Sequence, residues 1–276
     1  MRSGDDIHGN GVKLTGVGDF INAFCSEWLK RKRSLGSWLL VVGALFTPVI
    51  VVAARLIHRD QLPALYATST FWISLWRSSW ESMAIFFLPM AAILATSLIT
   101  QIEYRNNAWK QVHTLPLSVA TIFFSKLAVI LVLMVQFFIL FDLGVYLSAM
   151  IPYLMFANIP YPSAPLPGWS FLDDTGQYMI ATLPIIAAQY LLSLQFKNFL
   201  VPIGVGFMMW VGALASLPSK FGYTVPYAYS MMLYLKGNPK GRISVPAIPL
   251  PWLALGYAVA FTAASYVLFA NKRQRG

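Results

Sequence analysis

Few residues of this sequence could do catalytic or metal chemistry, and they are far apart. Glu81, Glu103 and Asp142 fall at different depths of the expected helices, and none has a histidine as a partner. Catalysis inside a membrane requires a nucleophile, metal ligands or carboxylates that face one another. The three histidines are scattered over segments expected on different sides of a membrane (His8, His58, His113). We therefore expect no catalytic residue and no metal site.

Cofactor chemistry is also not expected within this chain. No Gly-x-x-x-x-Gly-Lys-[Ser/Thr] sequence occurs, so the chain cannot bind a nucleotide through a P-loop. Cys25 is the only cysteine, which excludes an intrachain disulfide. The one polar candidate is Asp142, an ionisable residue within a long apolar run, which needs a partner or water and suggests function. The simpler interpretation is a structural hydrogen bond to a neighbouring helix.

The composition indicates an all-α, polytopic membrane protein. Hydrophobic residues make up 58% and charged residues 11%, whereas soluble proteins have roughly a quarter charged residues. The apolar blocks reach the roughly 20 residues that a spanning helix needs, and none shows the alternation of a β-barrel. We expect one membrane domain over 19–276, after a mobile cytoplasmic tail over 1–18. Its spans are predicted at about 38–57, 82–100, 119–148, 178–194, 199–217 and 252–270. The Ser118 hydroxyl can cap the third span, and Gly204, Gly206 and Gly212 should let other helices approach the fifth closely.

The basic residues predict the topology. A formal charge of +10 would suggest nucleic-acid binding in a soluble protein. Here most Lys and Arg residues fall on one side of a six-span arrangement, and the positive-inside rule makes that side cytoplasmic. Both termini are therefore expected in the cytoplasm, and no nucleic-acid partner is expected.

The segments on the other side are expected to be aromatic or rich in proline. Trp72, Trp76 and Trp80, at four-residue spacing within or next to 58–79, indicate an interfacial helix that anchors at the headgroups or contacts a substrate. Arg55, at the end of the first span, is expected to extend outward. The residues 150–177 predict a loop kept extended by prolines, and 226–235 a short re-entrant or surface helix.

A polar interval, 102–126, separates the second and third expected spans. Ala108, Trp109, Val112 and Leu115 recur at helical spacing with polar residues between them, which predicts a short amphipathic helix that ends before Pro116. Such a helix lies at the membrane surface or docks its apolar side into a partner.

A second amphipathic helix is expected near the N-terminus. Asp19 can cap it, Phe24 and Trp28 share one side with Phe20 and Ile21, and it ends in the basic cluster that runs from Lys30 to Arg33. This pattern predicts a helix along the inner membrane surface. The alternative is an ordinary basic flank that only fixes orientation.

These elements, in this order, resemble the membrane subunits of ABC-2 type transporters, and most closely the permeases for lantibiotic immunity or bacitracin resistance. The similar stretches are 26–34, 103–118 with Ser125-Lys126, the turn 193–198 and the basic end after Phe269. The resemblance implies that 107–115 is a coupling helix that binds a groove of a cytoplasmic ATPase. The residues it assigns to coupling are Glu103, Arg105, Asn107, Trp109, Lys110, Val112, His113 and Leu115.

Their implied roles differ. Trp109 and Val112 would be buried in the ATPase groove, while Arg105 and Lys110 would pair with acidic groups at its rim. Glu103 would bind the N-terminal interface helix (Phe24, Trp28, Lys30, Arg33), through Lys30 or Arg33.

The resemblance implies a multi-pass subunit of an exporter in a bacterial cytoplasmic (inner) membrane. Two permease chains, identical or related, would associate with two ATPase chains that bind ATP and Mg and export a hydrophobic or amphipathic cargo. A peptide antibiotic, as in antibiotic resistance, a lipid or a drug would fit, with contacts on the inward sides of the second and fifth spans. The alternative is a membrane anchor or sensor that recruits a cytoplasmic protein without transport.

Overall fold

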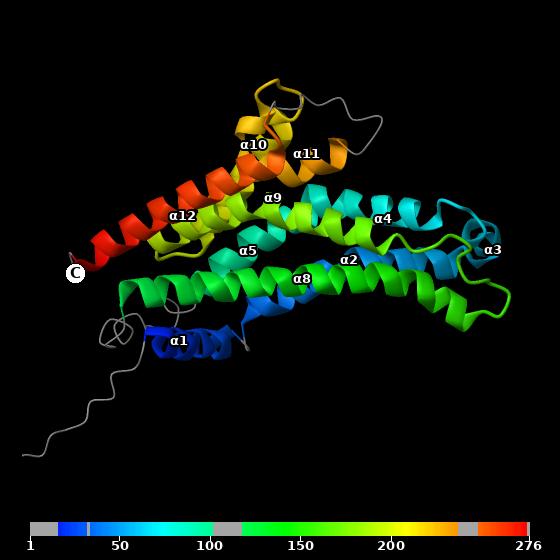
Figure 1. The fold of residues 1–276 in the computed structure, drawn as a ribbon, viewed down its shortest axis with the longest axis horizontal. Coiled ribbons are helices and arrows are strands. Elements are labelled where there is room, and N and C mark those ends of the chain that lie inside the picture. Colours follow the sequence, from blue (N-terminus) through cyan, green and yellow to red (C-terminus); the bar gives the residue numbers. More distant parts are fainter. Residues whose placement is uncertain (1–15, 32–33, 102–117, 237–247, 275–276) are drawn as a thin grey trace, which may run out of the picture.

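The chain forms a bundle of long helices in a computed structural model (Figure 1). The structure describes residues 16–31, 34–101, 118–236 and 248–274, and every regular element within these ranges is helical. The main helices are α1 (Gly16–Arg31), α2 (Leu35–Ile57), α3 (Leu62–Tyr66), α4 (Phe71–Ser82), α5 (Leu88–Thr100), α8 (Val119–Met155), α9 (Gly168–Gln195), α10 (Leu200–Ser216), α11 (Tyr229–Lys236) and α12 (Leu250–Gln274). Short helical turns are η1 (Arg59–Gln61), η2 (Met83–Phe87), η3 (Gly222–Thr224) and η4 (Pro226–Ala228).

Five of the described helical stretches are long and apolar enough to cross a membrane. They are Gly36–Ile57, Phe71–Thr100, Val119–Met155, Gly168–Gln195 and Leu250–Lys272. The fifth expected span, 199–217, is the apolar helix α10, which has 17 residues and is short for a membrane crossing of about 20 residues. The polytopic helical class is confirmed, while six spans and the sidedness of the termini stay predictions.

The first correction concerns the expected surface tryptophans. α4, η2 and α5 form one continuous helical stretch, so the second span begins at Phe71 and not near Ser82. Trp72, Trp76 and Trp80 lie inside the protein, with exposed fractions of 2%, 8% and 2%. Trp80 stacks on Tyr178 of α9, with ring centroids 3.8 Å apart. Their four-residue spacing marks a helix face that packs inward, because the aromatic rings fill the space between α4, α8 and α9.

The second correction concerns Arg55, which points inward. Pro152 of α8 has no N–H, so the carbonyl of Ser148, four residues earlier, has no helical donor. The Arg55 Nη1 donates to this oxygen at 2.9 Å, and the Tyr66 hydroxyl of α3 donates to the Ala149 carbonyl at 2.7 Å. Arg55 is 8% exposed. The proline therefore explains why a cation is held inside the bundle and does not extend to the surface.

Two glycines allow close contacts between helices. A Cβ added to Gly144 of α8 would lie 2.8 Å from the Cγ of Pro48 in α2, and one added to Gly206 of α10 would lie 2.6 Å from Oε1 of Gln189 in α9. The expected close approach of α10 is thus confirmed at Gly206. At Gly204 and Gly212 a Cβ would meet nothing within 4 Å, so these two glycines do not serve a contact within the described chain.

The segment after α10 is folded into the bundle. Tyr227, Ser230 and Met231 are fully buried. The Tyr227 hydroxyl donates to Gln189 Oε1 at 3.1 Å, and the Ser230 hydroxyl donates to the Ala84 carbonyl at 2.8 Å. The short helix α11 is therefore a buried element that packs on η2 and α9, and a surface helix is ruled out.

Other boundaries also differ from expectation. α1 begins at Gly16, inside the expected tail, and the remaining tail residues 1–15 lie outside the described ranges. α8 continues past residue 148 to Met155, and α9 begins at Gly168, so only 156–167 of the expected extended loop lies between helices. Apolar side chains and the Asp174 bond to Trp76 keep these extra turns packed on the bundle.

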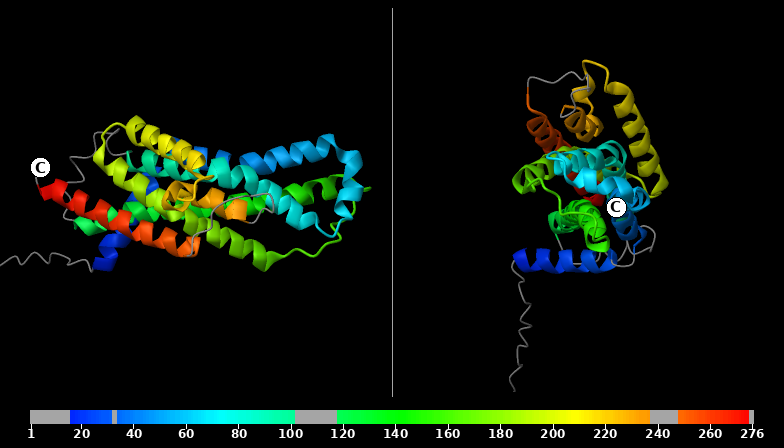
Figure 2. Two further views of the ribbon diagram at one scale, coloured as in Figure 1. Left: turned by 90° about the horizontal axis from the view of Figure 1, so that it is seen from above. Right: turned by 90° about the vertical axis from the view of Figure 1, so that its right-hand side faces the viewer.

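The bundle has two distinct ends. α1 and the C-terminal end of α12 lie at one end, and α3 lies at the other (Figure 1). We refer to these as the α1 end and the α3 end. Seen along the bundle, α1 lies across the other helices instead of running parallel to them (Figure 2, right). α12 packs chiefly on α9, and α1 on α8.

Candidate functional site

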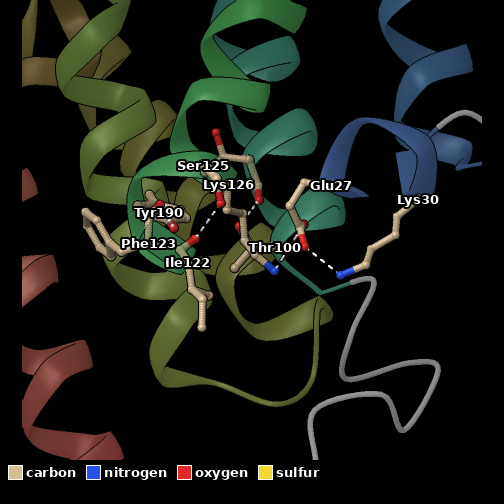
Figure 3. A network of polar contacts seen from close by, with 9 residues as sticks. Glu27, Lys30, Thr100, Ile122, Phe123, Ser125, Lys126 and Tyr190 are labelled. Atoms are coloured by element: carbon tan, nitrogen blue, oxygen red, sulfur yellow. Dashed lines mark hydrogen bonds and ion pairs between the residues drawn. The ribbon is translucent and has the colours of Figure 1, made fainter. Parts of the chain in front are cut away.

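An ion-pair cluster attaches α1 to α8 at the α1 end (Figure 3). Glu27 of α1 lies 3.5 Å from the Lys126 Nζ of α8 and 2.6 Å from the Lys30 Nζ of its own helix. The Lys126 side chain is 3% exposed and the Glu27 side chain 11%, while that of Lys30 is 33% exposed. Burial weakens solvent screening of the Glu27–Lys126 pair, so it holds α1 more strongly than the exposed pair.

Aromatic contacts complete the attachment of α1. Phe24 and Trp28 stack at 5.9 Å and pack against the core, and the Arg31 guanidinium lies 3.3 Å from the centroid of the Trp28 ring. Arg31 also donates to Gln136 Oε1 of α8 at 3.2 Å, and partial burial lowers the pKa of Arg31 from its usual value. Phe24, Trp28 and Lys30 thus form part of one docked helix. Arg33, the fourth predicted residue of this helix, lies outside the described ranges.

The ends of α5, α9 and α12 are joined beside this cluster. The Gln101 side-chain amide, directly after α5, donates to the carbonyls of Ser193 and Phe196. The Lys272 ammonium of α12 donates to the carbonyls of Leu194 and Gln195 at 3.2 and 3.3 Å. These acceptors belong to the end of α9, where helical donors are lacking and a cation is favourable.

The predicted coupling residues lie between Gln101 and Ser118 in the sequence. Glu103, Arg105, Asn107, Trp109, Lys110, Val112, His113 and Leu115 all lie in 102–117, outside the described ranges. The residues on either side are described. Gln101 binds the end of α9, and Ser118 caps α8 by accepting a hydrogen bond from the Thr121 N–H at 3.0 Å, as the sequence predicted. The described residues on both sides of this segment, Gln101 and Ser118, therefore lie at the α1 end.

Sequence reasoning missed the Glu27–Lys126 pair. It paired the N-terminal helix with Glu103 and did not consider an acid on that helix itself. The signal was present, because Glu27 and Lys30 are three residues apart and so share a helix face. Lys126 is a lone cation one to two turns into a long apolar helix, and such a residue needs a nearby acid.

Asp142 lies away from this end, in the half of α8 nearer to α3. Its Oδ2 accepts a hydrogen bond from the Thr175 hydroxyl of α9 at 3.0 Å. The structural hydrogen bond to a neighbouring helix, which was the simpler interpretation of Asp142, is thus present. Its Oδ1 is buried and has no hydrogen-bond partner among the described residues, so this bond does not fully account for the carboxylate.

The comparisons with known proteins agree with this architecture. The sequence profile described as ABC-2 family transporter protein matches residues 23–213, from α1 through most of α10. The comparison with curated proteins finds no match to this chain, and the specific likeness to lantibiotic or bacitracin permeases therefore stays a prediction. The matched segment is more than half of the chain and contains four of the five apolar spans. The chain belongs to the ABC-2 family of transporter proteins, as a multi-pass membrane component.

Proposed function

We propose that this chain is the permease subunit of an ATP-driven exporter and that it transmits mechanical work from a separate ATPase. Family membership implies an ABC ATPase partner and a membrane context. The observation that carries the proposal is the α1 end, where the Glu27–Lys126 ion pair holds α1 on α8 and the Gln101 amide holds the end of α5 on the end of α9. Gln101 and Lys126 lie on either side of residues 102–117 in the sequence. A segment that receives force can move a bundle only if its two ends are firmly attached to different helices.

In the proposed transport cycle, the 102–117 segment binds the groove of the ATPase. Trp109 and Val112 would supply buried contacts, and Arg105 and Lys110 would pair with acids at the rim. Closure of two ATPase chains would push on the segments of two permease chains, identical or related. The force would pass to α5 and α8 and change which side of the bundle is open. ATP and Mg would bind the ATPase alone.

A charge-reversal experiment tests this assignment. Lys110→Glu is expected to reduce ATPase binding or to uncouple ATP hydrolysis from export, because it places an acid against the acidic rim. The same reversal at Lys13, in the N-terminal tail, is the matched control and is expected to leave both unchanged. Normal ATPase binding together with normal export in Lys110→Glu would contradict the coupling role.

Truncation of the Trp109 side chain tests whether this residue anchors the ATPase interface. Trp109→Ala is expected to weaken ATPase binding by about 30-fold, because a buried tryptophan anchor contributes about 2 kcal/mol or more. Trp169→Ala is the matched control, since Trp169 is 87% exposed and lies in the first turn of α9, at the opposite end of the bundle. Affinity for the purified ATPase, measured in detergent, compares the two variants. Equal affinity in both would remove Trp109 from the interface.

The cargo is proposed to be hydrophobic or amphipathic, and the membrane to be a bacterial inner membrane. A peptide antibiotic, lipid or drug fits a bundle whose interior is mainly aromatic and aliphatic. The anchor or sensor alternative is not favoured, because the family consists of transporter components. Cargo-dependent ATP hydrolysis by the reconstituted complex separates the two functions, since an anchor would recruit the ATPase without this dependence.

A further inference from the structure

An apolar cavity of about 240 Å³ lies toward the α3 end of the bundle. α4, α8 and the start of α9 contribute equally to its lining, together with Leu166, which precedes α9. The lining residues are Trp72, Leu75, Trp76, Asp142, Val145, Tyr146, Leu166, Gly168, Phe171 and Leu172. Tyr146 and Leu172 are 38% and 61% exposed, so the cavity wall reaches the outside of the bundle.

Two stacked aromatic pairs form much of the wall. Trp72 and Tyr146 stack with centroids 5.9 Å apart and planes 5° apart. Trp76 and Phe171 stack at 4.1 Å and 4°. These pairs join α4 to α8 and α4 to α9, so the wall is held from three helices. Aromatic rings attract cations as well as apolar groups, and the attraction grows when the cation is removed from water.

The described lining contains one carboxyl group, that of Asp142, and no basic residue. Asp142 presents a carboxylate with one bonded oxygen and one buried oxygen, Oδ1, that has no hydrogen-bond partner in the described chain. A second carboxylate is close by, since the Trp76 Nε1–H donates to Asp174 Oδ2 at 3.1 Å. No Lys or Arg belongs to the described lining. A buried acceptor of this kind is costly unless a donor reaches it.

Other occupants fit this lining less well. A lipid tail would fill the aromatic space and leave Asp142 Oδ1 without a donor. A hard divalent cation takes six or more oxygen ligands in proteins, and one carboxylate in an aromatic wall does not supply them. A phosphatidylethanolamine headgroup carries an ammonium, but its phosphate would need a cation that the described lining lacks.

We propose that this cavity binds a protonated organic amine with an apolar body. The ammonium would donate to Asp142 Oδ1, and the body would lie against Trp72, Trp76 and Phe171. The site does not lie on the second span as it was expected, 82–100. Trp72 and Trp76 belong to the segment expected as an interfacial helix, for which a substrate contact was one of the two interpretations. α10, the expected fifth span, contributes no residue to the described lining. The proposal concerns binding by this chain alone and holds whether or not an ATPase drives transport.

A charge series on the unaltered protein gives the first test. The purified chain in dodecyl maltoside is titrated with 2-phenylethylammonium, with neutral 2-phenylethanol and with anionic 3-phenylpropionate, and binding is measured by calorimetry. The ammonium is expected to bind at least about tenfold more tightly than the alcohol, and the anion not at all. Equal affinity for ammonium and alcohol would overturn the proposal, and this comparison needs no variant to fold.

A matched pair of variants gives the second test. Asp142→Asn keeps the shape and the acceptor for Thr175, and is expected to remove the preference for the ammonium over the alcohol. Asp173→Asn is the control, because Asp173 binds Gln177 on the exposed side of α9 and does not line the cavity. An unchanged preference in Asp142→Asn would refute the role of this carboxylate.

A competition experiment identifies the source of the ammonium. Dihexanoyl phosphatidylethanolamine is expected to displace 2-phenylethylammonium at least about tenfold more weakly than a second amine of similar size. Equal displacement would refute the free-amine assignment, because a lipid headgroup would then be the ligand.

Discussion

Replacing Glu27 by Gln is expected to loosen α1 from the bundle. Glu27 is the carboxylate that lies 3.5 Å from the Lys126 ammonium and 2.6 Å from the Lys30 ammonium. Gln keeps the side-chain length and removes both ionic attractions. The change therefore isolates the charge that holds the N-terminal helix on α8.

The expected magnitude follows from the difference in burial between the two lysines. Two unit charges 3.5 Å apart attract by about 5 kcal/mol at an effective dielectric constant of about 20. Part of this is offset by desolvation, and losing one member of a buried pair costs about 3 to 5 kcal/mol. The exposed pair with Lys30 contributes about 0.2 to 1 kcal/mol. We expect Glu27→Gln to lower the free energy of unfolding by about 3 kcal/mol, which is roughly 6 to 12 °C in melting temperature.

The assay uses intrinsic fluorescence for the melting temperature and a spin label on Cys25 for the docking of α1. Cys25 is the only cysteine of the chain and is exposed on α1, so no engineered site is needed. Lys30→Gln is expected to cost less than about 1 kcal/mol. Asp19→Asn, on the same helix, has no ion pair among the described residues to lose. The reasoning is refuted if Glu27→Gln has the same melting temperature as Asp19→Asn and the spin label on Cys25 is equally mobile in both.

Three further predictions, two of them with a control substitution, concern the packing of the bundle. Gly144→Ala is expected to destabilise by about 1 to 3 kcal/mol because its Cβ would lie 2.8 Å from the proline ring of α2, whereas Gly256→Ala, with open space around it, should stabilise by up to about 1 kcal/mol in the same melting assay. Gly206→Ala should likewise lower the melting temperature, and Gly204→Ala, two residues away in the same helix, should not. Tyr66→Phe should cost about 1 to 3 kcal/mol because it removes the buried hydroxyl donor to the α8 carbonyl; a melting temperature equal to that of the unaltered chain would show that this bond is not needed.

The sequence predicted the elements that depend on apolar length and local capping. The helix class, the position of α2 and the Ser118 cap follow from hydropathy and from one hydroxyl, and the structure confirms them. Contacts between distant segments could not be predicted in this way. The Arg55 bond to the Ser148 carbonyl depends on a proline nearly a hundred residues away in the sequence, and hydropathy carries no information on which helices are neighbours.

The position of the three tryptophans was predicted wrongly for the same reason, because residue type does not tell which helices are neighbours. Trp72 and its neighbours suit a headgroup-level position by residue type, and only the presence of α8 and α9 against α4 makes them interior. For the coupling residues, 103–115, the sequence remains the basis of the assignment. Asp142 was recognised from the cost of a charge in an apolar run, but the aromatic cavity around it required the arrangement of three helices.

The π-helical turn η2, Met83–Phe87, determines how the two halves of the second span are oriented about their axis. A π turn accommodates one residue more than an α turn, and each residue of an α-helix corresponds to about 100° of rotation. If the same residues wound as a regular α-helix, with none deleted, α4 would rotate by about that angle relative to α5. The tryptophan face would then turn away from the cavity while α5 kept its contacts. The winding of these five residues thus sets how the tryptophan face of α4, toward the α3 end, is oriented relative to α5, which runs toward the α1 end.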